Sequence, residues 1–156
     1  MLNEVFGFSI SDQDIEDIIQ LLKQLTSQEK EFESLLEVRI VIGHPDLRLY
    51  AFRDQESGRI VGMASLKIDK IQMLTQNYIK GFIGDVIVKA DYRGRGIGER
   101  LIKKYIETAR KVGVKQVNLT SNPNNPNRTA AIKLYEKLGF QKIGELNKSN
   151  YYRLEL

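Results

Sequence analysis

The chain has 156 residues, of which 42% are hydrophobic and 28% are charged, a balance typical of one folded globular domain. We therefore expect a single domain over residues 1–156. No apolar run approaches the roughly 18 residues of a membrane-spanning helix, and the first residues lack the pattern of a secretory signal, so we expect a cytoplasmic protein with no membrane partner. The chain has no cysteine and one histidine, which excludes disulfides, thiolate metal sites and cysteine nucleophiles, and we expect no bound metal.

The charge is unevenly distributed along the chain. The net charge is +4, from 24 basic and 20 acidic residues. Residues 1–88 carry nine Lys/Arg and fourteen Asp/Glu, or −5, residues 89–115 carry nine against three, or +6, and residues 116–156 carry six against three, or +3. The basic excess therefore begins just after residue 88. By itself it fits a solvated helix face as well as an anion-binding surface.

The first half of the chain contains signals for short strands and two helices. The expected elements, in chain order, are a strand over 5–10, a helix that begins after Ser11, a helix over 28–42, and a hairpin with strands over 47–53 and 59–68. Ser11 and Asp14 have the spacing of a capping box, and apolar residues follow them at helical intervals. Gly58 closes the hairpin turn, where a residue with positive φ is often needed.

The second half continues with alternating strands and helices. The expected elements are a strand over 81–89, a helix over 96–111, a strand over 116–121, a helix over 128–138, and strands over 140–145 and 151–156. The continuous apolar run Val86-Ile87-Val88 is typical of a strand buried on both faces. The order β-α-α-β-β-β-α-β-α-β-β predicts an α+β (mixed α/β) layered fold. Strands 81–89 and 116–121 would be parallel across a right-handed crossover, and the rest of the sheet would be mostly antiparallel.

The turn between strand 81–89 and the next helix has the clearest chemical signal. Glycine stands there at three alternate positions, Gly94, Gly96 and Gly98. Such spacing lets backbone N–H groups converge at a helix N-terminus, which favours a phosphate, and Arg93 and Arg95 add positive charge. The spacing does not fit a dinucleotide fingerprint, because Glu99 replaces the third glycine, or a P-loop, because no Gly-Lys pair occurs.

Two motifs together resemble those of the GCN5-related N-acetyltransferase (GNAT) family. The first is strand 85–88 followed by Tyr-Arg-Gly-Arg-Gly-Ile-Gly at 92–98, and the second is Ala-Ile-Lys-Leu-Tyr-Glu-Lys-Leu-Gly-Phe at 131–140. The expected element order also resembles that family, so the resemblance covers most of the chain, although residues 1–80 match only in pattern. It implies the family's layered fold, in which the parallel strands 81–89 and 116–121 splay apart.

The resemblance implies acetyl-coenzyme A as the cosubstrate. Its pyrophosphate would bind main-chain amides of the turn, and its pantetheine arm would pair with the apolar strand. The cofactor-binding residues expected on this basis are Val86, Ile87, Val88, Arg93, Gly94, Arg95, Gly96, Ile97, Gly98 and Glu99.

Many family members have an asparagine seven residues before the motif tyrosine, whereas this chain has Arg128 there. Asn127 or Asn122 would supply the missing amide, unless Asn127 instead caps the helix. The alternative is that Arg128 itself reaches a cofactor phosphate or an acidic substrate group.

The expected reaction is direct attack of an amine on the acetyl thioester. An acyl-cysteine is excluded, and no G-x-S-x-G elbow suggests an acyl-serine. Tyr135, the tyrosine of the second motif, would protonate the leaving thiolate, the alternative being a core aromatic. Asp85 would act as the base, directly or through water, the alternative being a structural hydrogen bond. Backbone N–H groups near Ile87 and Val88 would polarise the carbonyl.

The sequence leaves the acceptor open between a small-molecule amine and a peptide amine. The acidic balance of residues 1–88 favours a cationic acceptor, and solvated helix charge is the alternative. A non-catalytic acetyl-CoA-binding module is the alternative function. The basic segment 89–115 lacks interleaved stacking aromatics, which argues against a nucleic-acid binder. A homodimer stays open.

Overall fold

A seven-stranded sheet forms the centre of the part of the chain that the computed structural model describes, which comprises residues 2–5, 10–25, 35–72 and 74–156. Its strands are β1 (Leu2–Val5), β2 (Leu47–Arg53), β3 (Ile60–Gln72), β4 (Asn77–Val88), β5 (Gln116–Ser121), β6 (Gln141–Leu146) and β7 (Ser149–Glu155). The helices are α1 (Asp12–Leu25), α2 (Leu35–Ile42), α3 (Ile97–Lys111) and α4 (Thr129–Lys137), with short 3₁₀ turns at η1 (Ala90–Tyr92) and η2 (Pro126–Arg128).

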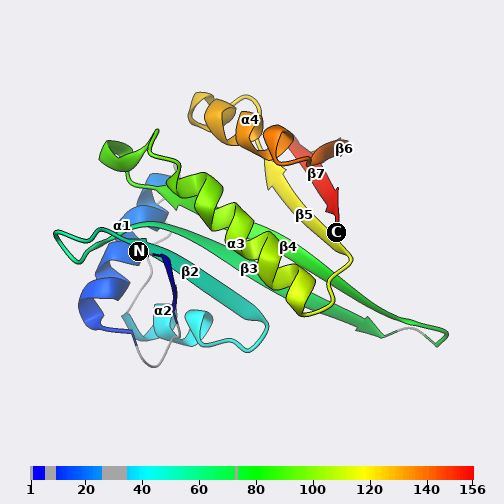
Figure 1. Cartoon of the computed structure of the whole chain (residues 1–156), viewed down its shortest axis with the longest axis horizontal. Helices are drawn as coiled ribbons and strands as arrows, with labels where there is room; N and C mark the ends of the chain where they lie inside the picture. Colours follow the sequence, from blue (N-terminus) through cyan, green and yellow to red (C-terminus); the bar gives the residue numbers. More distant parts are fainter. Residues whose placement is uncertain (1, 6–9, 26–34, 73) are drawn as a thin grey trace.

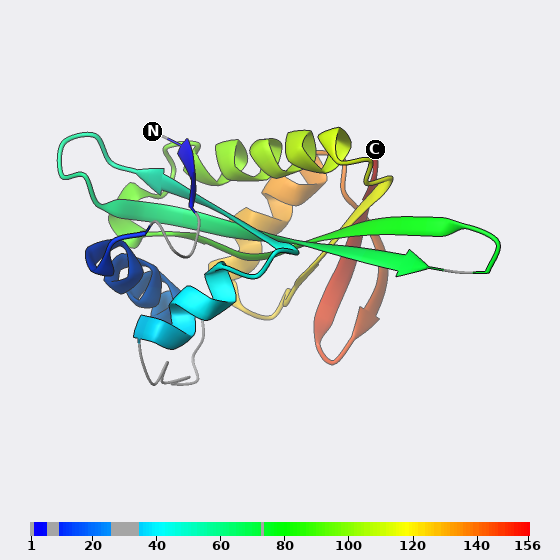
Figure 2. The ribbon, with the colours of Figure 1, turned by 90° about the horizontal axis from the view of Figure 1, so that it is seen from below.

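The strands lie in the order β1-β2-β3-β4-β5-β7-β6, and the β4–β5 pair is parallel while the other pairs are antiparallel. Helix α3 covers one face of the sheet, and α1 and α2 cover the other (Figures 1 and 2). Apolar residues of α3 and α4 share one core cluster, and those of α1 and α2 share the second. The element order and the mixed α+β class predicted from the sequence are therefore confirmed. None of the helices in the described part of the chain is both long and apolar enough to cross a bilayer.

Local sequence signals explain how the helices begin and which face they bury. The Ser11 Oγ accepts the Asp14 N–H at 3.1 Å, and an Asp14 carboxylate oxygen accepts the Ser11 N–H at 3.4 Å, which is the predicted capping box. In α3 the buried residues follow a 3.6-residue period; they are Ile97, Leu101, Ile102, Tyr105, Ile106 and Ala109. Gly113 follows α3 with φ of +81°, the left-handed conformation that commonly ends a helix.

Strand β4 contains a bulge that separates it from β5. Met63 pairs with Ile87 and Ser65 pairs with Gly84, so two residues of β4, Asp85 and Val86, lie opposite one residue of β3. Asp85 has φ of +48°, the left-handed conformation typical of the first residue of one bulge class. The pairing of β4 with β5 covers only four residues of each strand and ends at Ile83. The predicted splay of the parallel strands is therefore present, and it begins at the bulge.

The side chain of Tyr105 connects α3 to the strands on which it packs. Tyr105 is fully buried, and its hydroxyl accepts the backbone N–H of Tyr50 at 2.7 Å. The same hydroxyl lies within hydrogen-bond distance of the Arg48 and Ala64 carbonyls. Ala64 is the β3 residue that lies opposite the β4 bulge. One phenol thus links the middle of α3 to β2 and to the partner strand of the bulge.

The structure differs from the sequence prediction at the boundaries of several elements. The first described strand is Leu2–Val5, whereas the sequence predicts a strand over 5–10, of which residues 6–9 lie outside the described residues. Residues 28–34 of the helix predicted over 28–42 also lie outside them, and its described part is Leu35–Ile42. Strand β3 extends to Gln72 rather than ending at residue 68, because its outer part pairs with Asn77–Lys80 of β4 in a ribbon that projects beyond the sheet (Figure 2). Pairing between distant residues, which local composition does not encode, sets this length.

Candidate active site

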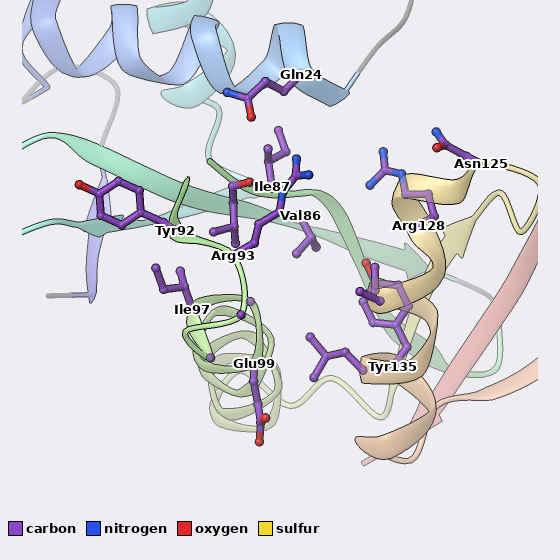
Figure 3. Close-up of a pocket in the computed structure, with 17 residues that line it drawn as sticks. Gln24, Val86, Ile87, Tyr92, Arg93, Ile97, Glu99, Asn125, Arg128 and Tyr135 are labelled. Atoms are coloured by element: carbon purple, nitrogen blue, oxygen red, sulfur yellow. Dashed lines mark hydrogen bonds between the residues drawn. The ribbon is translucent and has the colours of Figure 1, made fainter. Parts of the chain in front are cut away.

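A cavity of about 340 Å³ opens beside β4, between the N-terminal turn of α3 and the inner face of α4 (Figure 3). Of the residues expected from the sequence to bind the cofactor or to act in catalysis, ten line it: Val86, Ile87, Val88, Arg93, Gly94, Gly96, Ile97, Gly98, Glu99 and Tyr135. Arg95 and Asp85 are not among the lining residues. The side chain of Asn127 is outside the described part of the chain.

The glycine turn leaves open space at the N-terminus of α3. Gly94 and Gly96 both have φ of +75°, and no atom lies within 4 Å of the position where a Cβ would stand on either. The first helical hydrogen bond of α3 runs from the Arg100 N–H to the Gly96 carbonyl at 3.1 Å. The N–H groups of residues 97–99 therefore precede the helical ladder and remain available to an anion in front of the helix.

The two arginines of the turn have different surroundings. Arg93 donates from Nε to the Val88 carbonyl at 3.1 Å and lines the cavity. Arg95 donates to the Asp91 carbonyl at 3.0 Å, and its guanidinium lies 4.8 Å from the centre of the Tyr92 ring. Arg95 therefore adds to the positive field of the turn from outside the cavity, whereas Arg93 lies at its wall.

The free edge of β4 lies along the cavity. The Lys89 N–H bonds the Val61 carbonyl of β3 at 2.8 Å, and backbone groups alternate in direction along a strand. The backbone groups of Ile87 thus face β3, and those of Val86 and Val88 face the opening toward β5. Beyond Ile83 the described part of β5 supplies no partner for them. This edge can pair with an extended ligand as an added strand would.

Tyr135 lies at the α4 side of the cavity. Its ring is 4% exposed and packs near the rings of Phe140 and Tyr152, with centroids 6.1 and 6.3 Å away. Burial raises the pKa of the Tyr135 phenol, and the positive charge of Arg128 partly opposes this rise. The phenol therefore remains protonated near neutral pH and can donate a proton. Tyr135 is both a core aromatic and a residue of the cavity wall, so the two readings of the sequence are compatible.

Asp85 lies at the bulge and is exposed. Its carboxylate accepts a hydrogen bond from the Ser65 hydroxyl at 3.0 Å. Ser65 stands between Ala64 and Leu66, whose side chains belong to the α3-side core, so Ser65 and the Asp85 carboxylate lie on the opposite face of the sheet. Asp85 and Tyr135 therefore approach the splayed end of β4 from opposite faces.

Three polar residues of the cavity wall were not assigned a firm role from the sequence. They are Gln24 of α1, Asn125 before η2 and Arg128 at the start of α4. Figure 3 shows Gln24 and Arg128 on opposite walls, both on the α1 side of Tyr135. They converge only in the folded chain, and the one signal in the sequence is that Arg128 stands where the family pattern has asparagine. No group of three metal-ligating side chains occurs among the described residues.

Among the described residues that line the cavity, Glu99 is the only carboxylate, and two lysines neutralise it. Its oxygens lie 2.8 Å from Lys103 Nζ on α3 and 2.8 Å from Lys137 Nζ on α4. Hydrogen bonds from Lys103 and Lys137 lower the pKa of Glu99 to about 2. In Figure 3 its side chain points away from the other labelled residues. Glu99 thus joins α3 to α4 and does not place a free negative charge in the cavity.

The lowered pKa of Glu99 predicts how stability depends on pH. A depressed carboxyl pKa stabilises the fold above the ordinary value of 4.5, and this contribution is lost as pH falls toward 2. Thermal unfolding from pH 7 to 2 should therefore show a steeper acid loss of Tm for the wild type than for Glu99→Gln. Glu136→Gln, which changes an exposed carboxylate on α4, is the control and should follow the wild type. Parallel curves of Tm against pH for the wild type and Glu99→Gln would contradict a stabilising link between α3 and α4 through Glu99.

Comparison with known proteins shows that this chain is similar to acetyltransferases in sequence and in fold. A glucosamine 6-phosphate N-acetyltransferase from Trypanosoma brucei brucei is 39% identical over 90 residues, which cover 58% of this chain and 56% of that relative. The chain thus spans about half the length of this curated relative. A crystal structure of a Trypanosoma brucei acetyltransferase is 28% identical, with a TM-score of 0.74 over 94% of this chain and 96% of that one.

A more distant structure shares the fold over the whole length. Arabidopsis thaliana NAA60 in complex with acetyl-CoA is 18% identical and has a TM-score of 0.75, with 100% of this chain and 98% of that chain covered. Residues 13–140 match the family described as "Acetyltransferase (GNAT) family". That range contains the glycine turn, the splayed strand pair and Tyr135. The chain therefore belongs to the GNAT acetyltransferase family.

Proposed function

We propose that this chain is an N-acetyltransferase that transfers the acetyl group of acetyl-CoA directly to an amine. The observation that carries the proposal is the arrangement along one cavity. An anion-binding helix N-terminus, a free strand edge and a buried, protonated phenol line it together. Membership of the GNAT family supports the same activity.

The cavity offers a group to each part of acetyl-CoA. The N–H groups of residues 97–99 and the Arg93 guanidinium would bind the pyrophosphate. The backbone carbonyls of Val86 and Val88 would accept hydrogen bonds from the amides of the pantetheine arm. The Arg93 side chain donates a hydrogen bond to the Val88 carbonyl in this structure. It would therefore turn toward the phosphates when the pantetheine arm pairs with that carbonyl. Apolar side chains along the wall, Ile97, Ala131 and Leu134, suit the methylene groups of the arm.

The residues around the splayed strands can perform the proton transfers. Acetyl-CoA supplies the thioester whose carbonyl carbon the amine attacks, so that a C–N bond forms and the C–S bond breaks. Asp85 would accept the proton that the amine loses, directly or through one water. The N–H of Val88 would donate to the carbonyl oxygen as negative charge develops on it. Tyr135 would donate its phenolic proton to the departing sulfur and regain a proton from solvent, and Asp85 would release to solvent the proton that it took from the amine.

The acceptor is proposed as a primary amine of a small molecule or a peptide. The T. brucei relative is named for glucosamine 6-phosphate, a small amine, and its match covers 56% of its length, so this substrate is one candidate among several. A cytoplasmic location, a homodimer and a single domain over residues 1–156 stay predictions from the sequence.

Tyr135→Phe tests the proposed function and the proton donor together. Wild-type protein should release free thiol from acetyl-CoA with at least one member of an amine panel, and mass spectrometry should show the acetylated amine. Tyr135→Phe should lower kcat by about 100-fold or more while acetyl-CoA affinity changes little, because only proton donation to sulfur is lost. Its residual rate should also lack the alkaline fall that deprotonation of a phenol with a raised pKa produces above about pH 10.

Tyr152→Phe is the matched control for this variant. Tyr152 is 2% exposed and its ring lies 6.3 Å from that of Tyr135, yet it does not line the cavity. It should therefore reproduce the loss of a buried hydroxyl and keep kcat near the wild-type value. Unchanged turnover of Tyr135→Phe at all pH values would remove it as the acid. Tight acetyl-CoA binding without turnover of any amine would instead favour a binding module.

Asp85→Asn separates a base from a structural hydrogen bond. Asparagine tolerates positive φ and can still accept the Ser65 hydroxyl, so the bulge should persist. If the carboxylate is the base, kcat/KM should fall by about 100-fold. Ser65→Ala keeps the carboxylate and removes its partner, so its loss should be less than about tenfold. Full activity of Asp85→Asn, or equal small losses in both variants, would exclude Asp85 as the base.

Gly96→Ala tests the phosphate site against a control at the other end of the same helix. Gly96 and Gly113 have φ of +75° and +81° and open space at the Cβ position, so alanine at either should destabilise the fold by about 1 kcal/mol. Only the methyl at Gly96 enters the space in front of the α3 N-terminus. Calorimetry should show acetyl-CoA affinity reduced by about tenfold or more in Gly96→Ala and unchanged in Gly113→Ala. Equal affinities would place the phosphates elsewhere.

A further inference from the structure

Arg128 is a cation of the cavity wall for which the described residues provide no counter-ion. It lies at the junction of η2 and α4 and is partly buried. Within the described ranges, no carboxylate is within salt-bridge distance of its guanidinium, and its recorded hydrogen bond is that of its backbone N–H to the Asn125 carbonyl at 2.9 Å. Figure 3 shows the guanidinium directed into the space between α4 and Gln24.

Among the described residues of the cavity wall, none compensates the charge of this guanidinium. The other charged residues of its wall are Arg93, which is also a cation, and Glu99, which two lysines already neutralise. The charge of Arg128 is close enough to Tyr135 to lower the pKa of its phenol against the effect of burial. A partly buried cation beside the reacting groups is stabilised when an anion binds there.

The place of Arg128 indicates which ligand would carry that anion. The phosphates of acetyl-CoA already have the α3 N-terminus and Arg93 at the opposite wall. Arg128 lies instead near Tyr135, where the sulfur would be, and on the side that faces α1 (Figure 3). An anion at this point belongs to the molecule that approaches the thioester from the α1 side, which is the acceptor.

We propose that Arg128 binds an anionic group of the acceptor, so that the preferred acceptor is an amine that also carries a carboxylate or a phosphate. This inference rests on the proposed function and names its substrate class. It differs from the cationic acceptor suggested by the acidic residues of 1–88. Of the glutamates behind that suggestion, Glu37 is exposed on α2 and is not among the residues that line the cavity, and Glu29, Glu31 and Glu33 lie outside the described residues.

Matched acceptor pairs test the proposal. Glucosamine 6-phosphate and glucosamine differ by a phosphate, and lysine and cadaverine differ by a carboxylate. In wild-type protein, kcat/KM should be at least about tenfold higher for the anionic member of one pair or both, and the pair that responds identifies the anion. In Arg128→Gln the kcat/KM values of the two members of the pair should lie within about threefold of each other. The change should appear mainly in KM, because the variant loses a charge-assisted hydrogen bond that changes affinity by roughly tenfold to 100-fold.

Two further variants control for charge and for folding. Arg128→Lys keeps the charge without the planar fork and should retain part of the ratio. Lys133→Gln removes an exposed cation from the same helix, outside the cavity wall, and should retain the wild-type ratio. Higher kcat/KM for glucosamine and cadaverine in wild-type protein would overturn the proposal, as would a ratio that Arg128→Gln leaves intact.

Calorimetry distinguishes failure of this inference from failure of the proposed function. If Arg128 instead serves the cosubstrate, Arg128→Gln should lose acetyl-CoA affinity and slow all acceptors equally, which overturns the inference alone. If acetyl-CoA binds but no amine is acetylated, the proposed function fails. Titration of glucosamine 6-phosphate and of lysine into the CoA complex then decides the inference: weaker binding to Arg128→Gln than to wild type supports it, and equal or absent binding overturns it.

Discussion

The bulge in β4 is the constraint on which the site depends. One extra residue opposite Ala64 redirects the strand just where its parallel pairing with β5 ends. Without that insertion, β4 and β5 would continue to pair side by side and their backbone groups would satisfy each other. With it, Val86 and Val88 keep hydrogen-bonding groups that the described part of β5 does not use. The same bulge turns Asp85 into a left-handed conformation toward the opposite face. The cavity and a candidate base thus arise from a single irregularity of the sheet.

The sequence predicts most of the fold because short-range patterns encode it. The capping box of Ser11, the 3.6-residue stripe of α3 and the apolar run before the glycine turn each require only a few neighbouring residues. The bulge does not have such a signal, because it is a register shift between residues about twenty apart in the chain. Asp85 precedes the apolar run Val86-Ile87-Val88 as the sequence indicates, but no local pattern reports its exposure or its left-handed backbone. The convergence of Gln24 and Arg128 on one cavity likewise depends on how α1 and α4 pack, which no local pattern reports.

The structure also changes how the basic segment after residue 88 is understood. Several of its lysines are in ion pairs with glutamates of the same helix, as Lys103 is with Glu99 and Lys111 with Glu107. Such pairs reduce the local positive field along the helix. The positive character of the cavity therefore comes from fewer groups than the composition suggests: Arg93, Arg128 and the N-terminus of α3. Arg93 and the N-terminus of α3 lie at one wall, and Arg128 lies at the other. This arrangement suits two ligands that carry their negative charges at opposite ends of the cavity.

Tyr105 gives this arrangement a mechanical consequence. Its phenol is fully buried and bonds the backbone of β2 and β3, including the residue opposite the bulge, from the middle of the helix whose first turn faces the cavity. A displacement of that helix along the sheet would break hydrogen bonds inside the buried core, where bulk solvent does not reach. The glycine turn and the splayed strand edge are therefore connected as one unit through a buried hydroxyl. Binding at this unit needs little ordering of the backbone, so most of the interaction energy is retained as affinity.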